Sequence, residues 1–193
     1  MRRADNRISR REFVAMGFVA LASPAFGQSK SVPRTHGEQT KEVVPFASGE
    51  APGTIIIYNE ERLLFRILGN GQAERYRISV GRDGFLWTGT TTVGRKAEWP
   101  AWRPPAAMRT RNPSLPDYVP PGPYNPLGAR AIYLFSGGQD TLYRIHGTNS
   151  ADTVGGYETS GCFRLTNTDV MDLFQRVPVG TRVIVHSSMS GGQ

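Results

Sequence analysis

Short β-branched runs separated by tight-turn residues are the feature that most restricts the fold of this chain. Residues 54–58, 62–67 and 74–80 each have the composition or the period-two alternation of a β-strand. Residues 59–61 and Gly69–Asn70–Gly71 provide the turns between them. Strands that follow one another through such short turns pair side by side, so we expect an antiparallel meander here.

The second half of the chain carries fewer but equally clear signals. Residues 131–135 and 142–146 are two further predicted strands, and 181–186 is the last. Residues 166–174 predict a helix with Asn167 or Thr168 as N-cap, because Val170, Leu173 and Phe174 recur on one face. The chain is therefore expected to form a mainly β single domain, over residues 53–188, with one short helix.

Residues 88–128 do not follow either period. This segment is rich in proline and holds Trp99 and Trp102. Long irregular segments within compact domains are usually functional or disordered. We expect an ordered excursion over one end of the sheet, which serves as a lid or a substrate wall; the alternative is a surface loop with its aromatic rings in the core.

The N-terminal residues have the organisation of an export signal. Residues 1–27 contain five arginines, then an apolar stretch from 13 to 26, then a small-x-small cleavage site at 25–27. Arg10–Arg11 resembles a twin-arginine motif, with an ordinary secretion signal as the alternative. The apolar stretch is short for a membrane span, and no other segment is apolar enough. We expect a periplasmic or exported protein, whose residues 28–52 form a flexible tether.

The charge of the chain excludes some partners. Removal of five arginines and two acidic residues with the signal lowers the formal net charge from +7 to +4. That value suits an anionic cell-envelope polymer or simple solubility. No basic cluster with interleaved aromatic residues indicates nucleic acid. One cysteine and scattered histidines do not form a metal-ligand set, and no cofactor motif is present.

Cys162 is the only cysteine, and it is the candidate nucleophile. Exported proteins normally carry paired cysteines or none. A cysteine attacks as thiolate and needs a base. His36 lies in the expected tether and His186 ends the last strand, whereas His146 ends a predicted strand before Gly147. His146 is therefore the expected base.

The neighbours of Cys162 fit acyl transfer. Gly161 allows a close backbone approach, and its amide with that of Cys162 is expected to form an oxyanion site. Arg164 can bind a substrate carboxylate, or be a surface charge. Ser160 is expected to orient the imidazole, with a plain turn serine as the alternative.

The segments around His146 and Cys162 resemble the motifs of a known family. Residues 143–149 and 159–165, with similar upstream segments at 93–100 and 121–128, resemble the catalytic signature of the bacterial L,D-transpeptidases with a YkuD-type domain. The resemblance covers about residues 53–186 and implies a mixed β-sandwich. It also implies Cys162, His146, Ser160 and Gly161 as catalytic, with peptidoglycan stem peptides as substrate. Gly147, Thr148, Asn149, Tyr133 and Arg164 are the expected substrate-binding residues.

The implied reaction has two half-steps with open alternatives. Cys162 would attack the bond between a diamino acid and a terminal D-alanine, giving a thioester. An amine of a second stem or of an envelope protein would resolve it; water would make the protein an L,D-carboxypeptidase. A non-catalytic peptidoglycan-binding module is the alternative from another class. A redox thiol would lack a resolving cysteine.

Overall fold

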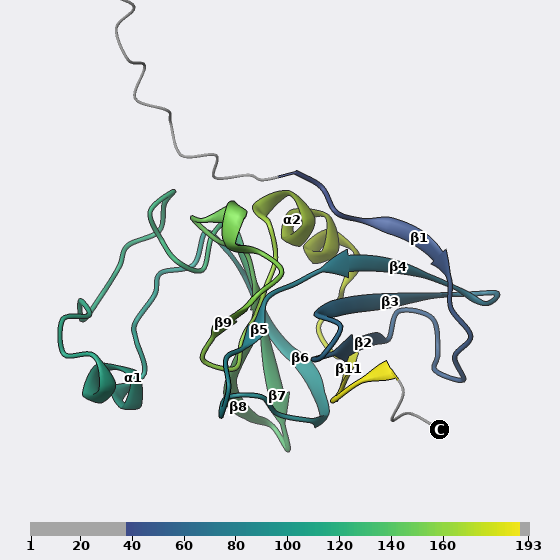
Figure 1. Cartoon of the computed structure of the whole chain (residues 1–193), viewed down its shortest axis with the longest axis horizontal. Helices are drawn as coiled ribbons and strands as arrows, with labels where there is room; N and C mark the ends of the chain where they lie inside the picture. Colours follow the sequence, from purple (N-terminus) through teal and green to yellow (C-terminus); the bar gives the residue numbers. More distant parts are fainter. Residues whose placement is uncertain (1–37, 190–193) are drawn as a thin grey trace, which may run out of the picture. The chain divides into compact units, whose positions relative to one another are not determined.

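The computed structural model describes residues 38–189, which lie in the compact unit 31–193. Their dominant feature is a nine-stranded mixed sheet of order β1-β4-β3-β2-β11-β6-β7-β8-β10, with a separate parallel pair, β5 and β9 (Figure 1). The elements are β1 Glu42–Pro45, β2 Ile55–Tyr58, β3 Leu63–Gly69, β4 Gln72–Arg77, β5 Val80–Gly81, β6 Gly89–Glu98, α1 Ala106–Arg111, β7 Arg130–Ser136, β8 Gln139–His146, a 3-10 turn Ala151–Thr153, β9 Tyr157–Thr159, β10 Phe163–Arg164, α2 Asn167–Arg176 and β11 Arg182–His186.

Both halves of the large sheet face one core. Apolar side chains of β2–β4, such as Ile55 and Leu64, and of β7–β8, such as Ile132 and Ile145, belong to a single buried cluster. Helix α2 adds Val170 and Leu173 to it. The predicted mainly β, mixed sandwich with a short helix after Cys162 is thus confirmed, and one curved sheet forms it.

Most of the predicted elements are present. Strands β2, β3 and β4 form the expected antiparallel meander, and β7, β8, α2 and β11 match their predicted segments closely. The predicted N-cap of α2 is wrong: Thr166 caps the helix, and its side chain accepts a hydrogen bond from the Asp169 amide. Thr166 has the extended backbone that N-caps require, which places the helix start at Asn167.

The prediction of an irregular segment from residue 88 is wrong for its first part. Strand β6 occupies 89–98 in the middle of the sheet, between β11 and β7. Its only fully buried large apolar side chain is Val93. Strand β6 is therefore stabilised by its pairing with β11 and β7, and not by an apolar pattern of its own.

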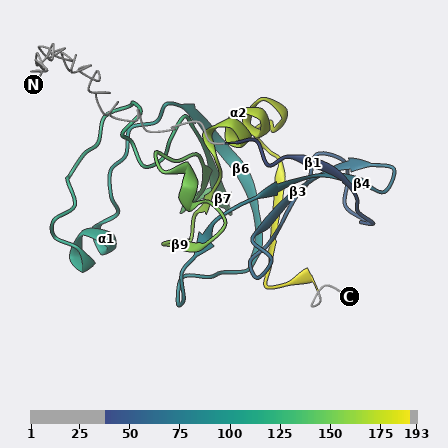
Figure 2. The same ribbon diagram turned by 45° about the horizontal axis from the view of Figure 1, so that its top comes forward.

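The prediction of a flexible tether up to residue 52 is wrong for the described part. Strand β1 pairs antiparallel with β4, and in Figures 1 and 2 it lies beside β4 and α2. Asp169 of α2 accepts hydrogen bonds from the Thr40 amide and hydroxyl, and Asp172 pairs with Lys41 at 2.9 Å. These contacts order the segment although its composition is that of a linker.

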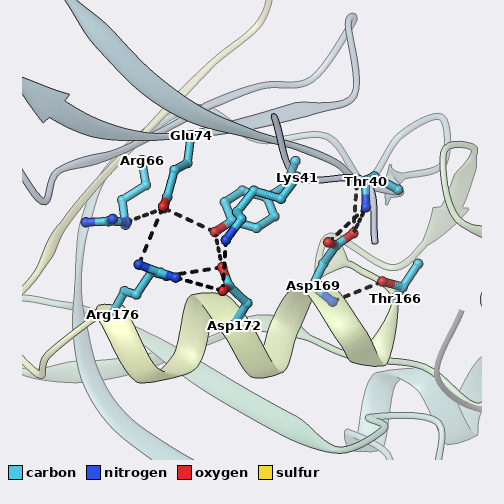
Figure 3. A network of polar contacts seen from close by, with 9 residues as sticks. Thr40, Lys41, Arg66, Glu74, Thr166, Asp169, Asp172 and Arg176 are labelled. Carbon is cyan, nitrogen blue, oxygen red and sulfur yellow. Dashed lines mark hydrogen bonds and ion pairs between the residues drawn. The ribbon is translucent and has the colours of Figure 1, made fainter. Parts of the chain in front are cut away.

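A polar network joins this segment to the sheet (Figure 3). The Asp172 carboxylate accepts from the Tyr76 hydroxyl at 2.7 Å and from Arg176. Tyr76 is fully buried in the core. The donors from Arg176, Lys41 and Tyr76 outweigh partial burial and lower the pKa of Asp172 to about 2. The Asp172 carboxylate is therefore ionised at neutral and mildly acidic pH.

The predicted signal peptide 1–27, the rest of the tether and His36 lie outside the described residues. Over 38–189, no helix has both the length and the apolar character needed to cross a membrane.

Candidate active site

Two adjacent strands hold Cys162 and His146. Strand β10 runs parallel to β8 with Arg164 opposite His146, and the Leu165 amide donates to the His146 carbonyl at 2.9 Å. On its other side the cysteine segment is held by Ser79, which exchanges two backbone hydrogen bonds with Arg164. Residues far apart in sequence are thus fixed in one place by backbone pairing.

The turn before Cys162 requires glycine at position 161. Gly161 has φ +104°, and a Cβ there would lie 2.5 Å from the Tyr143 ring. Its carbonyl accepts from the Trp87 indole at 2.9 Å, and Trp87 stacks on Tyr143. The predicted pairing of the Gly161 and Cys162 amides as an oxyanion site is wrong for this structure, because the Gly161 amide donates to the Thr159 hydroxyl.

His146 is held as a neutral base. Its Nδ1 lies 2.6 Å from the Gly147 carbonyl oxygen, so Nδ1 carries the proton and donates it. Nε2 is then free to accept a proton. The imidazole is only 6% exposed, and this burial, against the Gly147 hydrogen bond, lowers its pKa to about 4.

The Cys162 thiol is neutral at rest. Its Sγ lies 3.9 Å from the carbonyl oxygen of Leu142. Leu142 has φ +63° and lies within β8, where the register with β7 shifts. Burial raises the pKa of the Cys162 thiol, although the Arg144 backbone and charge act against this. Within residues 38–189, no hydrogen bond joins Sγ to the imidazole. The pair is a neutral thiol and a neutral imidazole that line the same cavity.

That cavity has a volume of about 650 Å³ and a basic wall. Its floor comes from β8, β9 and β10, and the opposite wall comes from residues 102–111, which include α1. The predicted excursion therefore does form a wall of the cavity, although Trp99 is 37% exposed and not in the core. The lining contains Arg82, Arg103, Arg111, Arg144 and Arg164, and Ser160 and Thr159 beside Cys162.

Arg164 lines the cavity with part of its guanidinium unpartnered. Its Nη2 donates to the Thr153 carbonyl, while its buried Nε has no hydrogen-bond partner among the described residues. Ser160 lines the cavity but makes no hydrogen bond to the imidazole within this part of the chain. The orienting group predicted at Ser160 is supplied instead by the Gly147 carbonyl.

Four predicted substrate-binding residues lie outside the cavity wall. Tyr133 is buried beneath the Arg95 and Arg144 guanidiniums. Gly147 and Thr148 belong to the loop after His146, and Asn149 donates to the Tyr124 carbonyl. These residues support the site in this structure and do not line it.

Asn167, which the sequence did not indicate as a site residue, holds the residues around the site through hydrogen bonds. Its side-chain oxygen accepts from the Ala129 and Thr148 amides. A Cβ on Gly147 would lie 2.1 Å from the same oxygen. Glycine is therefore needed at 147 for close approach to α2, and the backbone there does not have a positive φ.

No metal site accompanies these residues. Over residues 38–189, no three His, Cys, Asp or Glu side chains gather in a way that could hold a metal ion.

Comparisons with known proteins agree with this geometry. The family model of the YkuD L,D-transpeptidase catalytic domain matches residues 52–185. The probable L,D-transpeptidase ErfK/SrfK of Escherichia coli K12 is 40% identical over an alignment of 139 residues, with 68% of this chain and 43% of that protein covered. The chain thus spans less than half the length of this relative.

Solved structures show the same fold. An Enterococcus faecium L,D-transpeptidase, solved as a point mutant, has a TM-score of 0.54 at 18% identity, over 70% of this chain and 50% of that one. A Brucella melitensis protein described as a probable carnitine operon oxidoreductase is 43% identical with a TM-score of 0.52, over 76% and 92%.

Proposed function

The chain belongs to the L,D-transpeptidase catalytic-domain family, and from this premise we propose that it is a cysteine-dependent L,D-transpeptidase acting on peptidoglycan stem peptides. One observation carries the proposal: Cys162 and a neutral, carbonyl-anchored His146 line one arginine-rich cavity. A nucleophile, a base and an anion-binding wall are the parts that acyl transfer on a carboxylate-bearing peptide needs.

In the first half-step the thiol becomes an acyl carrier. As a stem peptide enters, His146 Nε2 removes the thiol proton while Sγ attacks the carbonyl carbon that joins the diamino acid to the terminal D-alanine. The carbon–nitrogen bond breaks, and the imidazolium returns the proton to the departing D-alanine amine. The product is a thioester on Cys162. Since the resting pair is neutral, proton transfer accompanies the attack.

In the second half-step an amine resolves the thioester. The amine loses a proton to His146, its nitrogen bonds to the acyl carbon, and Sγ leaves and regains the proton. The amine of a second stem gives a crosslink, and that of an envelope protein gives an attachment. Water in its place gives hydrolysis. We infer that residues 1–27 direct export to the periplasm, where peptidoglycan lies.

Intact-protein mass spectrometry tests the nucleophile. Incubation with a tetrapeptide stem, or with a carbapenem as an acylating probe, should add one covalent mass to the protein. Cys162→Ala should add none, and His146→Ala should be acylated at least about a hundredfold more slowly, the usual contribution of a general base. An unmodified wild-type protein would contradict the proposal.

Product analysis then identifies the acceptor. With disaccharide tetrapeptides as substrate, crosslinked dimers indicate transfer to an amine, whereas tripeptide monomers alone indicate hydrolysis. Loss of all products in Cys162→Ala is the required control. A protein that binds the stems and releases no D-alanine would be a binding module.

A further inference from the structure

The cavity carries more positive charge than its own acidic residues balance. Among residues 38–189, Glu158 is the only acidic residue that lines the cavity. Arg144 pairs with Asp140. Arg82, Arg103, Arg111 and Arg164 form no ion pair within the same part of the chain. Uncompensated guanidiniums that share a cavity indicate an anionic ligand.

Two of these arginines meet at one aromatic ring. The guanidinium of Arg82 lies 4.6 Å from the centre of the Phe85 ring, and that of Arg111 lies 4.8 Å from the same centre. Neither guanidinium donates a hydrogen bond within residues 38–189. The ring fixes two like charges near each other while their planar sets of N–H donors stay available. A carboxylate that contacts both guanidiniums would relieve the repulsion and use those donors.

The position of this pair relates it to the reaction. Arg82 follows β5, and its amide donates to the Thr159 carbonyl at 3.0 Å, in the turn that leads to Cys162. Arg111 comes from the end of α1, on the opposite wall. In Figures 1 and 2, α1 lies beyond β9, away from β1. The pair thus bridges the catalytic turn and the outer wall, and is separate from Arg164 on β10.

We propose that Arg82 and Arg111, whose guanidiniums both contact the Phe85 ring, form a second carboxylate subsite that makes the enzyme prefer stem peptides with free side carboxylates over carboxamides. The proposal rests on the proposed function above. The carboxylate concerned is one that does not react: it belongs to an acidic residue of the stem away from the bond that Cys162 attacks. Amidation of that carboxylate removes its negative charge and places an amide N–H donor against the N–H donors of the two guanidiniums. The preference therefore follows from both charge and hydrogen bonding.

The test compares two synthetic tetrapeptide stems. One has free side carboxylates; in the other these are carboxamides, and the terminal D-alanine is unchanged. D-alanine release is measured for the wild-type chain, Arg82→Gln, Arg111→Gln and the double variant. Arg109→Gln is the matched control, since Arg109 lies on the same helix, pairs with Asp117 and is outside the wall.

The wild-type protein and Arg109→Gln should favour the free-carboxylate stem at least tenfold in kcat/KM. Each single variant should reduce this ratio several-fold through KM, and the double variant should bring it close to one. Activity on the carboxamide stem should fall less than activity on the free-carboxylate stem in each of these variants. Arg82→Lys and Arg111→Lys, which keep the charge, should retain part of the preference.

A double variant that keeps the wild-type ratio overturns the subsite, and so does an equal loss on both stems. If no stem acylates Cys162, the proposed function fails separately. The subsite is then judged by calorimetric binding of both stems to Cys162→Ala with and without the double change. Weaker binding of the free-carboxylate stem alone supports it, and equal binding overturns it.

Discussion

At the residue scale, the Gly147 carbonyl determines which chemistry is open to His146. This carbonyl accepts a hydrogen bond from Nδ1–H and so fixes the tautomer, and burial keeps the imidazole ring neutral. The more usual picture of a reactive cysteine, a thiolate paired with an imidazolium, does not apply to a thiol whose pKa is raised. The base therefore remains available in mildly acidic solution.

This gives a first prediction, for pH. A free histidine is half protonated near pH 6.5, whereas His146 takes its proton only near pH 4. The rate of Cys162 acylation should therefore stay level from about pH 8 to about pH 5 and fall toward pH 4. Stopped-flow acylation with a carbapenem measures the profile, with circular dichroism as a check of folding at each pH. A half-loss near pH 6.5 would contradict the buried, neutral base.

A second prediction concerns Asn167. In Asn167→Ala the buried amides of Ala129 and Thr148 lose their acceptor, and each unpaired amide costs about 1–3 kcal/mol. Urea unfolding should show a loss of about 2–5 kcal/mol, and acylation should slow because the loop after His146 loses its anchor. Gln175→Ala, on the exposed side of the same helix, is the control. An unchanged acylation rate in a destabilised variant would remove Asn167 from the positioning role.

Sequence patterns could identify some of these residues and not others. Cys162 and His146 stand out because each belongs to a local motif at a defined spacing. Asn167 and the Arg82–Arg111 pair act through partners tens of residues away, and no local pattern marks such contacts. The expected roles of Thr148 and Asn149 came from the family resemblance. In the structure the Thr148 amide donates to Asn167 of α2, and the Asn149 side chain donates to the Tyr124 carbonyl.

At the element scale, β6 and β1 show where prediction from pattern ends. Strand β6 is rich in threonine and contains Gly94, so neither alternation nor an apolar run marks it. A Cβ on Gly94 would lie 2.2 Å from the Phe135 ring of the neighbouring strand. Strand β1 is a short edge strand that is stabilised by its pairing with β4 and by the hydrogen bond of the preceding Thr40 to Asp169 of α2. Strands of both kinds depend on their neighbours more than on their own composition.

The contact between α2 and the N-terminal segment supplies a third prediction. The folded-state pKa of Asp172 lies below the unfolded value of about 3.9. Its stabilising effect is therefore complete above about pH 4 and is lost as pH falls toward 2. Asp172→Asn should cost about 2 kcal/mol at pH 7, and the difference from wild type should shrink below pH 4.

Urea unfolding at pH 7 and pH 3 measures this difference. Asp117→Asn is the control, because that carboxylate is 85% exposed in its pair with Arg109. An equal cost of Asp172→Asn at both pH values would show that the carboxylate's charge does not contribute.

At the scale of the whole molecule, β11 joins the two halves of the sheet. It pairs parallel with β2 and antiparallel with β6, and Val183 and Val185 contribute to the common core. Without β11, the strands β1–β4 and the strands β6, β7, β8 and β10 would not be paired in one sheet in the described order. The active site thus depends on a strand that carries none of its residues.

A fourth prediction tests that dependence. Val185→Asp places an unpaired charge in the central strand, where the side chain is 2% exposed. The cost of several kcal/mol is comparable to the whole stability of a domain, so the variant should not fold. Val179→Asp, at a position 60% exposed just before β11, should stay within about 0.5 kcal/mol of wild type. Far-UV circular dichroism and urea unfolding compare the two, and a folded Val185→Asp would contradict a central role for β11.

Because β11 is the last strand in sequence, its position also determines when the sheet can be completed during synthesis. Synthesis runs from β2 to β11, so β2 and β6 each have an unpaired edge until residues 182–186 have emerged from the ribosome. During that interval the partly built sheet is open to wrong strand pairing and aggregation. A chain interrupted before the last strand therefore has Cys162 and His146 but lacks the strand that joins the meander to β6.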